Sequence, residues 1–63
     1  MADLKQIRAA AGMTQRQLAD AAGVNIRQIQ KIEASEIKIG NVTLQNAAAL
    51  AQALGVPIEE LLK

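Results

Sequence analysis

The 63-residue sequence contains no cysteine, no histidine and no aromatic residue. The first two absences exclude a disulfide staple and the usual ligand sets of a zinc site. Without aromatic side chains there is no stacking platform of the kind that binds RNA or single-stranded DNA. We also find no glycine-rich phosphate loop and no isolated carboxylate pair, so we expect neither an enzyme nor a bound cofactor. A chain this short must gain its stability from helix packing or from self-association.

Long apolar runs and strong charge are absent as well. No stretch approaches the roughly 20 apolar residues that span a bilayer, and no signal-peptide pattern is visible. We therefore expect a cytoplasmic protein that contacts no membrane and takes no small-molecule substrate. The net charge is only +1, with a small basic excess in residues 1–40 and a small acidic excess in residues 41–63. This weak electrostatic signal does not by itself indicate a nucleic-acid partner.

Alanine is abundant, with runs at residues 9–11 and 47–49, and it has the highest helix propensity of all residues. Residues that favour N-caps and helix stops divide the chain into five predicted helices. The first begins near Asp3 and ends at Gly12, and the others span residues 15–22, 26 to 33 or 34, 44–54 and 58–62. Residues 35–42 alternate apolar and polar side chains, which predicts a loop with some extended character. The fold class is therefore all-α.

The second and third predicted helices are separated by a short turn around Gly23. Ala19 is small enough to let the two helices approach closely, and Gly23 can adopt the positive φ that the turn needs. Ile29 and Ile32 follow at positions that face inward. In the fourth helix, the residues predicted to form the apolar stripe are Leu44, Ala47, Leu50, Ala51 and Leu54.

Two runs of sequence resemble the phage repressor and Cro family of bacterial DNA-binding proteins. These are GMTQRQLADAAGVNIRQIQKIEAS at residues 12–35 and TLQNAAALAQALGVPIEELL at residues 43–62. The resemblance implies a compact five-helix bundle of the lambda-repressor-like type, one domain over residues 1–63, with the helix-turn-helix motif at 15–34. It also implies sequence-specific binding of double-stranded DNA, either by a transcriptional regulator or by a designed binder on this scaffold. Ser35 departs from the family, which often has glycine there.

The resemblance implies that helix 26–33 lies in the major groove and that its outward side chains meet the base edges. Arg27 can bond guanine through two atoms, Lys31 could reach a second guanine, and Ile26 can contact a thymine methyl group. The predicted base contacts are Ile26, Arg27, Gln30 and Lys31. The alternative is an ordinary solvated helix face, with Ile26 packed on the core.

Contacts to DNA phosphates are expected at the start of helix 15–22, where free backbone N–H groups and the helix dipole attract an anion. In the family, the glutamine that corresponds to Gln15 touches the DNA backbone. The predicted phosphate contacts on this rim are Thr14, Gln15, Arg16, Asn25 and Gln28, and further contacts are predicted from the loop at Lys38 and Asn41. Thr14 and Asn25 are also expected N-caps, and the two roles are compatible.

Arg8 and Glu33 each lie on an inward-facing stripe, and the resemblance implies that they meet as a structural ion pair. The alternative is two unrelated surface charges.

The function also has an alternative, because a fold does not determine a function. A protein-interaction or antitoxin-type module could keep this fold with little or no DNA binding. A homodimer on DNA, through residues such as Pro57, Ile58 and Glu59, and a monomer are both compatible with the sequence.

Overall fold

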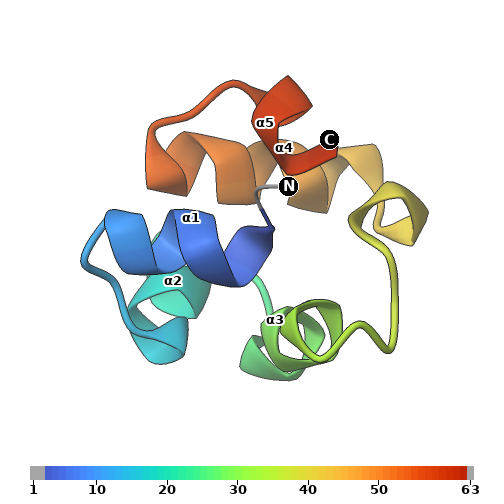
Figure 1. Ribbon diagram of the computed structural model, residues 1–63, viewed down its shortest axis with the longest axis horizontal. Coiled ribbons are helices and arrows are strands. Elements are labelled where there is room, and N and C mark those ends of the chain that lie inside the picture. Colours follow the sequence, from blue (N-terminus) through green and yellow to red (C-terminus); the bar gives the residue numbers. More distant parts are fainter. Residues whose placement is uncertain (1–2, 63) are drawn as a thin grey trace.

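The computed structural model describes residues 3–62, so residues 1, 2 and 63 of the predicted domain lie outside the described part of the chain. The elements are α1 (Leu4–Ala10), α2 (Gln15–Ala22), α3 (Ile26–Glu33), the short 3-10 helix η1 (Ile39–Asn41), α4 (Leu44–Leu54) and α5 (Ile58–Leu62). No strand is found among residues 3–62. Figure 1 shows α1 and α4 across the middle of the molecule, with α2 and α3 below them and α5 above. The predicted all-α five-helix fold is confirmed.

The helix bounds follow from capping side chains. At four helix starts, a side-chain oxygen accepts a hydrogen bond from a backbone N–H of the first turn, which satisfies a group that the helix leaves unpaired. These N-cap residues are Asp3, Thr14, Asn25 and Thr43. Gly23 ends α2 with a φ of 70° and a ψ of 29°, the left-handed conformation that glycine adopts without steric cost. The turn between α2 and α3 depends on this glycine.

The core is centred on three side chains that are almost completely buried. They are Leu18 of α2, Ile29 of α3 and Leu50 of α4. Each comes from a different helix, so the packing of these three residues holds α2, α3 and α4 together. Burying each such side chain contributes roughly 1.5–3 kcal/mol to folding.

Leu44 does not belong to the apolar stripe of α4, and this prediction was wrong. Its exposed fraction is 75%, whereas Ala47, Leu50, Ala51 and Leu54 are buried as predicted. Leu44 is the first residue of α4, at the end of the helix that lies at the rim of the molecule in Figure 1. Because side chains tilt toward the N-terminus of a helix, that of Leu44 extends beyond the helix end.

The segment after α3 is the predicted loop with some extended character, and it also contains a short 3-10 helix that the sequence did not indicate. Residues 35–42 form no strand but contain η1, so the extended character is limited to single residues such as Lys38 and Val42. Ser35 has a φ of 62°. This left-handed conformation explains why a glycine is common at this point in the family that the sequence resembles. Backbone strain of about 1–3 kcal/mol is typical of such residues.

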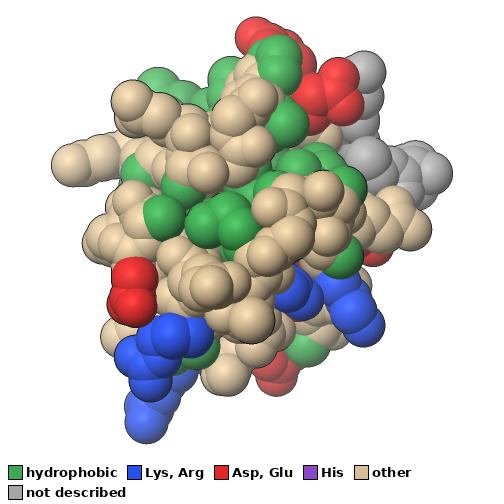
Figure 2. Space-filling view, turned by 90° about the vertical axis from the view of Figure 1, so that its left-hand side faces the viewer, with side chains coloured by type: hydrophobic (Ala, Val, Ile, Leu, Met, Phe, Trp, Pro, Cys, Tyr) green, Lys and Arg blue, Asp and Glu red, His purple; other side chains and the backbone are tan. Residues whose placement is uncertain are grey.

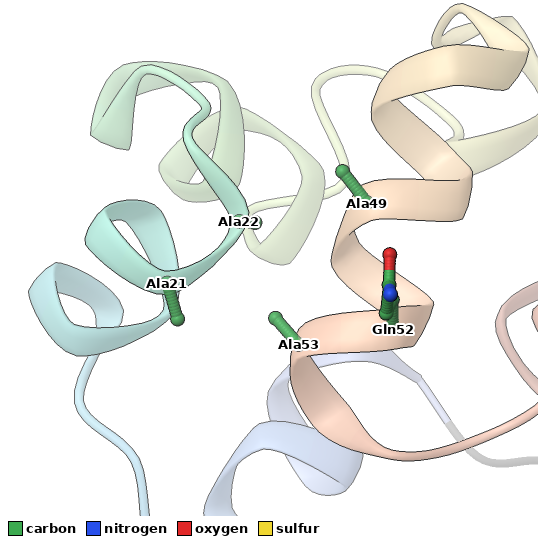
Figure 3. Close-up of a pocket in the computed structure, with 5 residues that line it drawn as sticks. All are labelled: Ala21, Ala22, Ala49, Gln52 and Ala53. Atoms are coloured by element: carbon green, nitrogen blue, oxygen red, sulfur yellow. The ribbon is translucent and has the colours of Figure 1, made fainter.

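Small side chains line the contact between α2 and α4. Figure 3 shows Ala21 of α2 and Ala53 of α4 pointing toward each other, with Ala22 and Ala49 beside them. A shallow hollow remains between the helices, and Gln52 is its one polar side chain. Because the residues in contact are alanines on both helices, α4 can lie close to α2 and support this first helix of the motif.

Candidate nucleic-acid interface

The α2–turn–α3 unit has the geometry that the sequence predicts for a helix-turn-helix. The backbone N–H groups of Gly23 and Val24 both donate to the carbonyl oxygen of Ala19, at 2.9 and 3.1 Å. Ala19 is buried, and Ile29 has no exposed surface. Ala19, Gly23 and Ile29 therefore determine the direction of α3 relative to α2. Helix α3 is held on its inner side and presents its polar side outward.

Three of the four predicted base-contact residues are exposed on α3: Arg27, Gln30 and Lys31. Ile26 is half-buried and packs against the core cluster. Its packing role is thus present in the structure, and only part of its side chain is accessible. All four base contacts stay predictions.

The predicted phosphate contacts at the start of α2 differ in how free their side chains are. Arg16 is exposed. Thr14 Oγ1 accepts from the backbone N–H of Gln17 at 3.0 Å, and Gln17 Oε1 accepts from that of Thr14 at 2.9 Å, so the two residues form a capping box. The side chain of Gln15 is half-buried, and its Nε2 donates to Glu33 Oε1 at 3.0 Å. Gln15 is therefore partly engaged within the protein.

At the start of α3, Asn25 Oδ1 accepts from the backbone N–H of Arg27 at 2.8 Å, which is an N-cap bond. Gln28 is half-buried, and its Oε1 accepts from Asn46 Nδ2 of α4 at 3.0 Å. Sequence analysis missed Asn46. No local pattern could have indicated it, because the contact joins residues 18 positions apart and depends on how α4 crosses α3.

Lys38 and Asn41 lie together, away from the other predicted phosphate contacts in sequence. Both are exposed, and they line a groove that is also lined by Asp3, the N-cap residue of α1, and by Leu62 at the end of α5. The structure thus groups these two residues with the ends of the described chain. Their contacts with phosphate remain predictions.

The structure brings Arg8 and Glu33 together. Arg8 Nε donates to Glu33 Oε2 at 2.6 Å, Nη2 donates to Oε1 at 3.1 Å, and Nη1 donates to the carbonyl oxygen of Met13 at 2.7 Å. The exposed fractions of the two side chains are 14% and 5%. A guanidinium and a carboxylate in this two-bond geometry form a strong, directional pair. It ties α1 to the end of α3.

Burial raises the pKa of the Glu33 carboxyl, but the remaining influences outweigh it. Hydrogen bonds from Arg8 and Gln15, together with the positive charges of Arg8 and Lys5, lower this pKa to below its ordinary value of 4.5. The hydrogen bond to Glu33 in turn raises the pKa of Arg8. Both partners are therefore charged at neutral pH.

The lowered pKa of Glu33 predicts a loss of stability in acid. The ionised carboxylate stabilises the fold fully above pH 4.5, and this contribution is lost as the pH falls through the lowered pKa. The difference in unfolding free energy between the protein and a Glu33→Gln variant should therefore be constant near neutrality and shrink below pH 4.5. Urea unfolding over a series of pH values measures it. A difference that does not change with pH would contradict the prediction.

The charged side chains are unevenly distributed on the face shown in Figure 2. The Lys and Arg side chains visible there lie in the lower half, on the side of α2 and α3, and a band of hydrophobic side chains crosses the centre. The basic charge of this face thus lies near the motif.

Among residues 3–62, we find no helix that is both long and apolar enough to cross a bilayer.

Comparisons with known proteins agree with this geometry. Residues 4–61 match the model of the helix-turn-helix family. The fold is similar to the crystal structure of the restriction-modification controller protein C.AhdI from Aeromonas hydrophila, with a TM-score of 0.81 and 33% sequence identity. The match covers 92% of this chain and 83% of that one. A comparison with curated protein sequences finds no match. The chain therefore belongs to the helix-turn-helix family of DNA-binding regulators, as the resemblance to phage repressor and Cro proteins predicted.

Proposed function

We propose that the protein regulates transcription by placing α3 in the major groove of double-stranded DNA. The observation that carries this proposal is the outward face of α3, where Arg27, Gln30 and Lys31 are exposed on a helix whose other side is buried. A polar helix face on a rigid scaffold suits direct reading of base edges. The proposed activity is DNA binding without covalent chemistry. We propose that it takes place in the cytoplasm, where bacterial DNA lies.

The proposed base readers have separate roles. Arg27 would donate to the O6 and N7 atoms of a guanine, and Lys31, one turn further along α3, would reach a second base. The exposed part of Ile26 would contact a thymine methyl group, and Gln30, one turn after Ile26 and Arg27, would lie on the same outward face. Arg16, at the start of α2, would contact a phosphate on the same side of the duplex, because α2 crosses the DNA backbone in this docking geometry.

We also propose that two copies bind together on DNA. Two symmetric half-sites of a duplex read by helix-turn-helix dimers lie about 34–36 Å apart. Pro57, which precedes α5, and Glu59 of α5 are exposed, and the exposed fraction of Leu62 is 52%, so this end of the protein is accessible to a second copy. Selection of bound sequences from a random duplex library reports half-site, spacing and symmetry together.

We also propose a controller role for this chain, because the similar protein C.AhdI is a restriction-modification controller protein.

A titration with random-sequence duplex at low salt tests the proposed function. We expect weak binding that falls steeply with salt, with log K decreasing by about 0.9 per log unit of salt for each phosphate that a Lys or Arg neutralises. Replacing exposed Arg16 by alanine should reduce this slope by about one contact. Absence of binding at low salt would contradict the proposal and favour a protein-interaction module.

A further inference from the structure

We propose that Asn46 is a positioning residue for DNA binding, because it turns the side-chain amide of Gln28 so that its N–H groups face a DNA phosphate. This inference rests on the proposed function, in which α3 enters the major groove. Asn46 lies on α4, outside the helix-turn-helix motif. The proposal adds a residue from the supporting helix to the DNA-binding surface.

The hydrogen bond between these residues joins α3 directly to α4. Asn46 Nδ2 donates to Gln28 Oε1 at 3.0 Å, and both residues are half-buried. The backbone of Asn46 is held as well, because its N–H donates to Oγ1 of the N-cap residue Thr43 at 3.2 Å. Gln28 is the third residue of α3. A fixed donor on α4 thus forms a hydrogen bond with a side chain in the first turn of α3, the helix that is proposed to enter the major groove.

The orientation of the Gln28 amide decides which DNA groups it can bind. An amide has one oxygen that accepts and one nitrogen that donates two hydrogen bonds. Because Oε1 faces Asn46, Nε2 is directed to the other side, and we find no partner for it within residues 3–62. Phosphate oxygens only accept hydrogen bonds, so they attract this side of the amide and would be repelled by its oxygen.

The same orientation argues against a role for Gln28 in reading bases. A glutamine recognises adenine with its oxygen and nitrogen together, and both must face the base edge. Here the oxygen is turned toward α4. The contribution of Gln28 should therefore be independent of DNA sequence, unlike that of the adjacent Arg27.

The first test compares the Asn46→Ala variant with the unaltered protein on random-sequence duplexes and on a selected site. Without Asn46, the Gln28 amide samples both orientations, so that about half of the molecules present its N–H groups, and we expect about twofold weaker binding on every sequence. The variant keeps the backbone bond to Thr43, so its melting temperature should change little. Gln52→Ala removes an exposed amide from the same helix and is the matched control, with unchanged affinity expected.

The second test is a double-mutant cycle with Gln28→Ala. If Asn46 acts through Gln28, Asn46→Ala has no further effect in the Gln28→Ala background. Asn46→Asp can only accept, so it should turn the Gln28 amide around and weaken binding more than alanine does. In the Gln28→Ala background, the excess loss should fall to the effect of the added charge. This dependence on Gln28 separates positioning from a structural role.

Two results would overturn the proposal. One is equal weakening by Asn46→Ala with and without Gln28, which would mean that Asn46 acts on DNA or on the fold by itself. The other is undiminished binding by both Asn46 variants. Failure of the unaltered protein to bind any duplex at low salt would instead overturn the proposed function, and this proposal with it.

Discussion

Replacement of Arg8 by alanine is expected to lower the free energy of unfolding by about 3–5 kcal/mol. The side chain of Glu33 is only 5% exposed, and without Arg8 its charge would keep a single side-chain hydrogen bond, from Gln15. A buried charge that loses its partner is among the costly defects in a protein. At roughly 0.05–0.15 kcal/mol per residue, a domain of this size has only about 3–9 kcal/mol in total. The loss should therefore amount to at least about a third of the total stability.

Urea unfolding followed by far-ultraviolet circular dichroism measures this loss, since the chain has no aromatic residue for fluorescence. Arg16→Ala is the matched control, because it removes an exposed arginine from the neighbouring helix and should change the stability by no more than about 0.5 kcal/mol. A loss for Arg8→Ala as small as that of the control would mean that the pair acts as two ordinary surface charges.

A variant that lacks both charges shows whether Arg8→Ala loses stability because the Glu33 carboxylate is left unpaired or because the hydrogen bonds of Arg8 are lost. We expect a double variant, Arg8→Met with Glu33→Leu, to be more stable than Arg8→Ala, because it leaves no uncompensated carboxylate in the protein. If the double variant is as unstable as Arg8→Ala, the energy instead comes from the bonds themselves, including that of Arg8 to the Met13 carbonyl.

The pair also explains why the motif needs the rest of the chain. Glu33, the last residue of α3, accepts from Arg8 of α1 and from Gln15, the first residue of α2. One carboxylate therefore joins three helices at the point where α2 begins and α3 ends. Gln15→Ala should accordingly affect the stability of the motif as well as any phosphate contact of Gln15.

The bounds of the five helices could be predicted from the sequence because capping is local. An N-cap oxygen bonds a backbone group two or three residues away, so Asp3, Thr14 and Thr43 indicate helix starts without knowledge of the fold. Burial was harder to predict at Leu44, because periodicity identifies a face but not where the neighbouring helices end.

The hydrogen bonds of the candidate site could not be predicted in the same way. Whether Gln15 reaches Glu33, or Asn46 reaches Gln28, depends on the distance and angle between helices. The family resemblance implied the pair of Arg8 and Glu33, but composition and spacing left it open. Base contacts depend further on the DNA, and they require binding experiments.

Replacement of Arg27 by alanine is expected to remove about 1–3 kcal/mol of discrimination at one base pair. Arg27 is exposed, and its backbone N–H, which alanine retains, donates the N-cap hydrogen bond to Asn25 Oδ1. The fold should therefore be unchanged, and the loss should appear in DNA binding. The free energy difference between a selected site and its single-base variants, measured for each position of the half-site, reports the effect.

The pattern across positions is the decisive part of this result. A base reader loses selectivity at the one position that it contacts, whereas a phosphate contact weakens all sequences alike and lowers the salt slope. Arg16→Ala should show the second pattern and is the control for Arg27→Ala, since both remove one exposed arginine. If Arg27→Ala weakened every sequence equally, Arg27 would be a phosphate contact, and the reading of bases would fall to Lys31, Gln30 and the accessible part of Ile26.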